Sequence, residues 1–123
     1  MFWLILVLIA LVVALLMYML PLIQVCGDSM YPTFNDGDII LGCRLYHTKK
    51  ESIYVYRPPL GEKYVIKRLK HINPSNPHKL FFEGDNSRNS YDSRMYGYVS
   101  QNKLVAKYVL TIYRRKEDDY NDC

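Results

Sequence analysis

The first stretch of the chain is continuously apolar, whereas the rest alternates between short apolar runs and polar turns. From Phe2 to Ile23 no charged residue occurs, and only Tyr18 and Pro21 interrupt the hydrophobic run. As an α-helix these residues would span roughly 33 Å at about 1.5 Å per residue, which is enough to cross a bilayer. The pattern therefore predicts a transmembrane anchor over residues 1–25.

A cleaved secretory signal, a lipoprotein signal and a buried core helix are also apolar. A cleaved signal has basic residues before its apolar run and a small-residue junction after it, and this sequence has neither feature. Lipid attachment at Cys26 would need a small residue just before the cysteine, where Ile23-Gln24-Val25 stands. These observations favour a permanent single-pass anchor. Lysine and arginine first occur at Arg44, so charge alone does not decide the orientation.

The remainder of the chain has the pattern of short strands separated by turns, with no long segment of helical period. Apolar and β-branched runs that predict strands lie at residues 39–41, 53–56, 64–69, 80–82 and 103–113. Clusters of Asn, Asp, Gly and Pro predict turns at 35–38, 73–77 and 84–86. We therefore expect a mainly β fold, with a small all-β domain over residues 26–113. The charged residues 114–123 are expected to form a disordered tail.

Charge and cysteine content narrow the choice of partners only slightly. The net charge is +4, but the 16 basic residues are interspersed with 12 acidic ones, so no nucleic-acid partner is expected. The three cysteines match no metal-binding spacing, and one stays unpaired even if Cys26 and Cys43 were bridged. The histidines show no paired spacing and are interpreted as surface residues.

One predicted strand carries a lysine among apolar neighbours. Alternation along residues 64–69 places Val65, Lys67 and Leu69 on one face, with Met30 a candidate to cover the lysine. Burial among apolar groups lowers the pKa of a lysine. With a reference pKa of about 10.4, about 0.4% of lysines are neutral at pH 8, and a fall of roughly two units makes about a quarter to a third neutral. Without other signals, an exposed strand lysine is the simpler interpretation.

Ser29 directly follows the apolar segment. A serine between Asp28 and Met30 is, by itself, more typical of a turn or a helix cap than of a nucleophile. A nucleophilic serine needs a neighbouring base, and no histidine lies near a serine-containing motif in this sequence. A neutral lysine would have to serve, which makes Ser29 and Lys67 a candidate catalytic pair.

Three segments occur in order: GDSMYPTFNDGDII from Gly27, YVIKRL from Tyr64 and FFEGDNSRNSYDSRMYG from Phe81. Together they resemble the nucleophile, lysine and final boxes of the type I signal peptidase family of Ser/Lys serine proteases. The resemblance implies that Ser29 is the nucleophile and Lys67 the general base. The short interval between Arg68 and Gly84 implies a minimal member that lacks a second β domain.

The resemblance also assigns supporting roles. Ser90 matches the hydroxyl that holds the lysine in the family. Asp85, Asp92 and Arg94 match positions of ion pairs that fix the last loop, with Arg68 a further partner, and solvated charge pairs are the alternative.

The oxyanion site departs from the pattern of some family members. Those members use a Ser or Thr hydroxyl two residues before the nucleophile, where this chain has Gly27. Backbone N–H groups, above all that of Ser29, are then expected to stabilise the developing negative charge. The glycine would let the backbone of a substrate approach closely.

The implied function is a membrane-anchored endopeptidase that removes signal peptides by cutting after small residues, as in Ala-x-Ala. Its partners would be precursor proteins with signal peptides and the lipid bilayer, with the catalytic domain on the outer, non-cytoplasmic face. Neither a metal nor a cofactor is implied. A dedicated protease for one precursor, like the maturation protease of nickel-type superoxide dismutase, is one alternative. An inactive β module that binds extended peptides is another.

Overall fold

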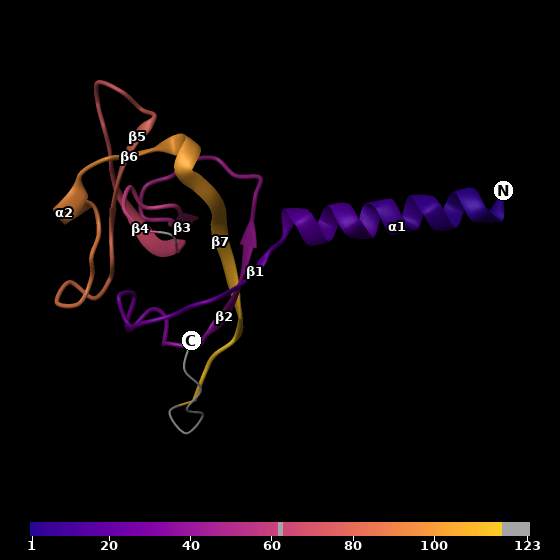
Figure 1. The fold of residues 1–123 in the computed structure, drawn as a ribbon, viewed down its shortest axis with the longest axis horizontal. Coiled ribbons are helices and arrows are strands. Elements are labelled where there is room, and N and C mark those ends of the chain that lie inside the picture. Colours follow the sequence, from indigo (N-terminus) through magenta and orange to yellow (C-terminus); the bar gives the residue numbers. More distant parts are fainter. Residues whose placement is uncertain (62, 117–123) are drawn as a thin grey trace.

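The computed structural model describes residues 1–61 and 63–116, in which one isolated helix is joined to a mainly β domain (Figure 1). Within these residues a seven-stranded sheet has the order β1-β2-β7-β3-β4-β5-β6, and all its neighbouring strands are antiparallel. The mainly β fold predicted from the sequence is confirmed. The elements are α1 (Phe2–Met19), β1 (Leu22–Gln24), β2 (Ile39–Cys43), β3 (Ile53–Tyr56), β4 (Val65–Ile72), β5 (Lys79–Glu83), α2 (Ser93–Tyr96), β6 (Val99–Ser100), the 3₁₀-helix η1 (Gln101–Lys103) and β7 (Leu104–Tyr113).

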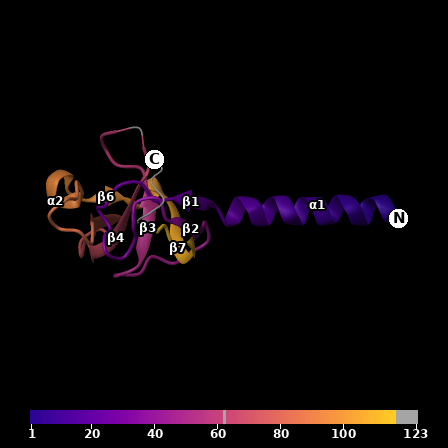
Figure 2. The same ribbon diagram turned by 90° about the horizontal axis from the view of Figure 1, so that it is seen from below.

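Helix α1 is apolar on all sides and projects away from the sheet (Figure 2). None of its residues is buried, and its mean hydropathy is 2.9. Its 18 residues span about 27 Å at about 1.5 Å per residue, close to the hydrocarbon thickness of about 30 Å in a bilayer. Length and composition suit a membrane span, and an N-terminal signal sequence meets the same criteria.

The helix ends at Met19, earlier than the end of the apolar run at Ile23. Pro21 has no N–H for a helical hydrogen bond and disfavours helical geometry in the residue before it. That residue, Leu20, has φ −120° and ψ 71°. The residues after Pro21 pair with β2 as the edge strand β1. Hydrophobicity alone missed β1, because a short apolar strand and the last turn of an apolar helix look alike in sequence.

The curled sheet has an apolar cluster on each face, and β3 contributes to both. Ile53 and Val55 belong to one cluster, and Tyr54 and Tyr56 to the other, because alternate residues of a strand point to opposite faces. The first cluster also contains Val25, Met30, Phe34, Ile40 and Ile66, and the second Leu69, Leu80, Phe82 and Val99.

Strand β4 follows the predicted alternation. Ile66 belongs to the first cluster, whereas Val65 and Leu69 pack in the second. Lys67 is buried between Val65 and Leu69 on the face that these two residues share. The strand therefore directs a lysine into the interior of the domain.

Strand β7 is the last in sequence, yet it lies inside the sheet between β2 and β3. It is long and curved, as predicted, and its pairing shifts register against both neighbours (Figure 1). After it, the backbone N–H of Arg115 donates to Asp38 Oδ1 at 2.8 Å, so the second residue of the predicted tail contacts the domain. The rest of that predicted tail, residues 117–123, lies outside the described residues.

Candidate active site

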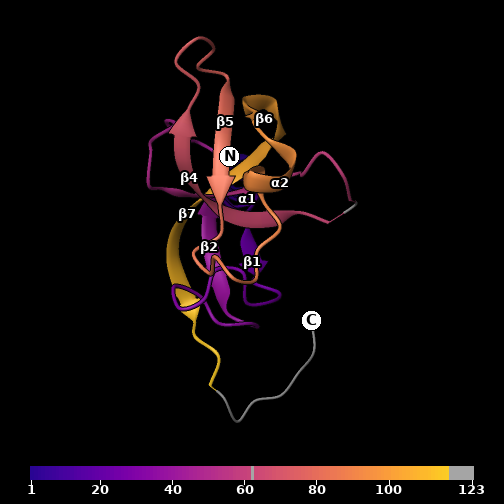
Figure 3. The ribbon, with the colours of Figure 1, turned by 90° about the vertical axis from the view of Figure 1, so that its left-hand side faces the viewer.

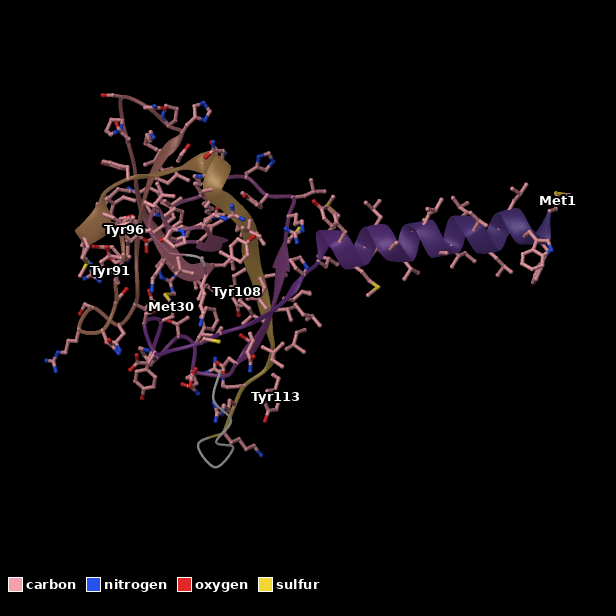
Figure 4. All side chains as sticks on the ribbon, viewed as in Figure 1. Met1, Met30, Tyr91, Tyr96, Tyr108 and Tyr113 are labelled. Carbon is pink, nitrogen blue, oxygen red and sulfur yellow. The ribbon has the colours of Figure 1, made fainter. Side chains whose placement is uncertain are left out.

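The loop between β1 and β2, residues 25–38, carries Ser29. Its two ends are joined, because Val25 N–H donates to the Asp38 carbonyl and Gly37 N–H to the Val25 carbonyl, each at 2.7 Å. Met30, directly after the serine, is 1% exposed and packs in the first apolar cluster (Figure 4). The buried methionine and the closed loop ends place Ser29 at the boundary between the core and solvent.

Lys67 reaches Ser29 from β4. Its Nζ lies 2.6 Å from Ser29 Oγ, and the lysine is only 4% exposed. Burial lowers the pKa of Lys67 below its ordinary value; the charge of Asp92 partly opposes this shift, and that of Arg94 adds to it. The two residues predicted as a catalytic pair are therefore in direct contact, in an environment that favours a neutral amine.

The turn after β5 holds the nucleophile loop. Asn86 donates its backbone N–H to the Ser29 carbonyl at 2.8 Å and its side-chain amide to the Asp28 carbonyl at 3.0 Å. The Asn89 amide donates to the Asp28 carboxylate, and the Asp85 N–H lies 3.4 Å from Met30 Sδ. Sequence reasoning missed both asparagines, although their signal was present: amide side chains beside a Gly-Asp turn can bridge backbone groups.

Gly84 permits the close approach of that turn. A Cβ at this position would lie 2.2 Å from Ser90 Oγ and 2.6 Å from the Ser29 carbonyl oxygen. Both distances are too short for non-bonded atoms, so any side chain here would push the turn away from the nucleophile. The glycine is needed for space rather than for an unusual backbone angle.

Asp92 is fully buried at the start of α2, beside β5 (Figure 3). Its carboxylate accepts hydrogen bonds from Gly84 N–H at 2.8 Å, Ser90 Oγ at 2.6 Å and the Arg94 side chain at 2.7 and 3.0 Å. Burial alone would raise the pKa of Asp92, but these donors hold it well below its usual range. Asp92 and Arg94, two of the residues expected at ion-pair positions, form an ion pair that fixes the last loop from inside.

Ser90 lies beside Gly84, as its closeness to a Cβ there shows. It was predicted to hold the lysine, but its hydroxyl donates to Asp92 instead. Within the described residues no hydrogen bond joins Ser90 to Lys67. In this structure Ser90 can influence the lysine through Asp92, whose charge acts on Lys67.

Arg68, the residue after the lysine, links β4 to the nucleophile loop through Asp85. Its Nε and one terminal nitrogen each lie 2.8 Å from an Asp85 carboxylate oxygen, a two-point contact. The hydroxyl of Thr33 donates to the same carboxylate. Burial alone would raise the pKa of Asp85, but the Arg68 and Thr33 hydrogen bonds lower it. Arg68, expected only as a further ion-pair partner near this loop, pairs with Asp85, and the contact of Thr33 was not foreseen.

Gly27 adopts a left-handed backbone conformation with φ +84°, and its N–H donates to Asp36 Oδ1 at 2.8 Å. In the part of the chain that the structure describes, the N–H of Ser29 donates to no protein group. The Ser29 N–H is therefore available to an oxyanion, and the Gly27 N–H is not.

A cavity of about 560 Å³ opens beside the Ser29–Lys67 contact. The apolar side chains of Ile23, Val55 and Ile66 line it, together with Gln24 and Cys26 from the end of β1. Because β1 is an edge strand with one neighbour, its outer backbone groups can pair with an added strand. The apolar cavity and the edge strand leave room for an extended peptide chain beside Ser29.

Residues 69–113 match the family model described as signal peptidase, peptidase S26. The match contains the last loop with Ser90 and Asp92, and it begins just after Lys67. No curated protein sequence matches the chain. The matched family is the one that the three sequence segments resemble. Over residues 69–113 the chain is therefore similar to the signal peptidase family, peptidase S26, and this similarity supports a peptidase.

Proposed function

We propose that the chain is a membrane-anchored serine endopeptidase that removes signal peptides from exported proteins. The observation that carries this proposal is the 2.6 Å contact between Lys67 Nζ and Ser29 Oγ, at a lysine that is 4% exposed. Only a neutral amine can accept the serine proton, and burial makes the neutral form more accessible. The similarity of residues 69–113 to the signal peptidase family supports peptide hydrolysis as the reaction.

The proposed reaction is acyl transfer in two stages. Ser29 Oγ attacks the scissile carbonyl carbon while its proton moves to Lys67 Nζ, and the carbonyl electrons become an oxyanion that the Ser29 N–H stabilises. The lysine then gives the proton to the leaving amine as the C–N bond breaks. A water molecule attacks the resulting ester as the neutral Lys67 takes its proton. Lys67 then returns that proton to Ser29 Oγ as the ester bond breaks, which releases the new carboxyl terminus and restores the enzyme.

The cavity beside the catalytic pair supports a substrate bound as an extended strand. Its walls at Ile23, Val55 and Ile66 are apolar, and the edge strand β1 borders it. Strand addition would align the scissile bond with Ser29, because β1 leads directly into the nucleophile loop. We propose small residues before the cut, of the Ala-x-Ala type, as the family resemblance implies.

Helix α1 is proposed as a permanent membrane anchor. Trp3 and Tyr18 lie near its two ends, and such amphipathic aromatic residues favour the two interfaces of a bilayer. The domain begins at Leu22, so the active site would face precursors held in the same membrane. We place the domain on the outer face, where exported precursors expose their junctions.

A dedicated protease for one precursor is the second candidate. The observation that favours it is the short hairpin between β4 and β5, in which residues 73–78 leave no room for a second β domain. A small domain offers few surfaces for recognising many substrates. An inactive peptide-binding module is less well supported, because the Ser29–Lys67 contact is intact.

The test uses the full chain, purified in detergent, with a precursor that carries an Ala-x-Ala junction. Wild type is expected to cut at the junction, whereas Ser29→Ala and Lys67→Ala should lose at least about 10³-fold in kcat. Ser87→Ala and Lys79→Ala, at exposed positions, serve as matched controls and should cut normally. Equal cleavage by wild type and either dyad variant would refute the mechanism. Cleavage of one precursor only, among several with such junctions, would favour the dedicated protease.

A further inference from the structure

Arg44 lies at the junction between the apolar helix and the sheet. It follows β2, and its backbone N–H donates to the Met19 carbonyl at 2.9 Å. Its Nε donates to the Tyr18 carbonyl at 2.7 Å, and its guanidinium carbon lies 4.7 Å from the centre of the Tyr18 ring. A single residue of the domain thus contacts the last turn of α1 in three ways.

These contacts supply hydrogen-bond donors and a positive charge to the C-terminal end of the helix. The last carbonyl groups of an α-helix have no partners within the helix, and they carry the negative end of its dipole. A cation with several N–H donors suits this position better than a neutral side chain. Arg44 therefore stabilises the end of α1 at Met19 and joins it to β2.

Few other contacts hold the helix to the domain. α1 buries none of its residues, so packing does not fix its direction. Besides Arg44, a hydrogen bond from Gly42 N–H to the Pro21 carbonyl, at 2.9 Å, joins the segment after α1 to β2. The angle between helix and sheet thus depends on a small set of hydrogen bonds around Arg44.

The catalytic site lies away from this junction. Met30, next to Ser29, is on the side of the domain opposite to the attachment of α1 (Figure 4). A change in the angle at the junction would therefore displace Ser29 and Lys67 further than residues close to the helix. A junction held by hydrogen bonds would keep the pair at a constant height above a bilayer in which α1 is embedded.

We propose that Arg44 is a positioning residue that fixes α1 to the sheet and so sets the height and tilt of the cleft relative to the bilayer. This inference rests on the proposed function, since it assumes an embedded helix and a membrane-held substrate. The guanidinium would lie at the level of the lipid headgroups with Tyr18, where an amphipathic ring and a cation are both favoured. A precursor in the same membrane presents its junction at a fixed height, whereas a soluble peptide approaches freely.

The experiment compares two substrates with the full chain in phosphatidylcholine and phosphatidylglycerol vesicles. One is a precursor whose signal peptide is embedded in the vesicles, and the other is a water-soluble peptide with the same junction. Arg44→Ala should lower kcat/KM on the embedded precursor about tenfold or more, the loss expected for one charge-assisted hydrogen bond. Its kcat/KM on the soluble peptide should stay within about twofold of wild type. The control Lys50→Ala removes an exposed positive charge and should change neither value.

Two further variants keep the proposal testable if Arg44→Ala folds poorly. Arg44→Lys keeps the charge but loses the planar donor, so its loss on the embedded precursor should be intermediate. Tyr18→Leu removes the ring from the helix side, leaves the domain unchanged and should reproduce the substrate-dependent loss. Hydrogen exchange at the N–H groups of Gly42 and Arg44 should become faster in Arg44→Ala, which reports the loosened junction without an activity assay.

The outcomes separate this inference from the proposed function. If wild type cuts both substrates and the Arg44 variants lose activity on neither, or equally on both, the positioning role is refuted. If wild type cuts neither substrate, the proposed function itself is refuted.

Discussion

The backbone N–H of Asn86 donates to the carbonyl oxygen of Ser29 at 2.8 Å, so the turn after β5 holds the nucleophile by its own main chain. The Asn86 side chain reaches one residue further back, to the Asp28 carbonyl at 3.0 Å. These two hydrogen bonds align residue 29 with the lysine on β4. The geometry of the Ser29–Lys67 contact therefore depends on a loop that contributes no atom to the proposed proton transfer.

Asn86→Ala should lower kcat with little change in KM. The substitution removes the hydrogen bond to the Asp28 carbonyl, and a shift of the nucleophile by about 1 Å can cost on the order of 10²-fold in rate. We expect a loss of about tenfold or more, measured by steady-state kinetics on a soluble peptide. Ser87→Ala, at the exposed neighbouring position, is the control. An unchanged kcat in Asn86→Ala would show that the turn does not position Ser29.

Gly84→Ala should abolish most activity because the turn after β5 has no room for a side chain at this position. The new Cβ would lie 2.6 Å from the Ser29 carbonyl oxygen and 2.2 Å from Ser90 Oγ, so the turn has to move. We expect a fall in kcat of about 100-fold and a loss of about 1–3 kcal/mol in the free energy of unfolding, measured by urea denaturation.

Gly97→Ala is the matched control for that substitution. Gly97 has φ +81°, and no atom lies within 4 Å of the position that a new methyl group would take, so only backbone strain of about 1–2 kcal/mol is expected. Its activity should stay near wild type despite the lower stability. If both alanine variants keep full activity, the steric role of Gly84 is wrong.

The rate should depend on the ionisation of Lys67. Burial lowers its pKa, and the neutral amine is the active form, so kcat/KM should rise with pH and level off below the ordinary lysine value of about 10.4. The measurement is kcat/KM for a soluble peptide between about pH 6 and pH 11. A rise centred at or above the ordinary value would contradict a buried, activated lysine.

The same lowered pKa should affect stability. Between the folded and the unfolded pKa of Lys67, the unfolded chain binds more protons, so the free energy of unfolding should rise with pH across that interval. The Lys67→Met variant cannot titrate there and should show a flatter profile, which denaturation at several alkaline pH values would measure. Parallel profiles for the two proteins would argue against the shift.

Asp92→Asn should change both acid stability and the rate profile. The pKa of Asp92 lies well below its unfolded value, so its contribution to stability is present above about pH 4 and is lost as the pH falls through the folded value. The variant should therefore be less stable at neutral pH and lose less on acidification.

The second effect of Asp92→Asn concerns the lysine. Removing a negative charge that raises the pKa of Lys67 should move the rise in kcat/KM to lower pH. Glu51→Gln, at an exposed acidic residue paired with Lys70, is the control and should leave the rate profile in place. If the rate profile of Asp92→Asn does not move along the pH axis, Asp92 stabilises the last loop without affecting the pKa of Lys67.

The sequence by itself indicated five of the seven described strands, β2, β3, β4, β5 and β7, and the face on which the lysine lies. The β-branched and aromatic run at 53–56 is β3, and alternation along β4 correctly places Lys67 with Val65 and Leu69. These features follow from local backbone geometry, because a strand directs alternate side chains to opposite faces whatever it pairs with. The apolar N-terminal segment was also evident from sequence, because its uninterrupted apolar composition indicates a helix with no polar face.

Only the tertiary structure decided how the loops meet. The end of the apolar run became strand β1 because β2 offered it backbone partners after Pro21. Asn86 lies against Ser29 because pairing of β5 with β4 brings the last loop over the loop that carries Ser29, whereas Ser90 donates to Asp92 in its own loop instead of to the lysine. The Asn86–Ser29 contact joins residues far apart in the chain, and its geometry depends on the folded sheet rather than on any local pattern. The sequence could therefore name Ser29 and Lys67 as the proposed catalytic pair, whereas the hydrogen bonds that hold them required the folded chain.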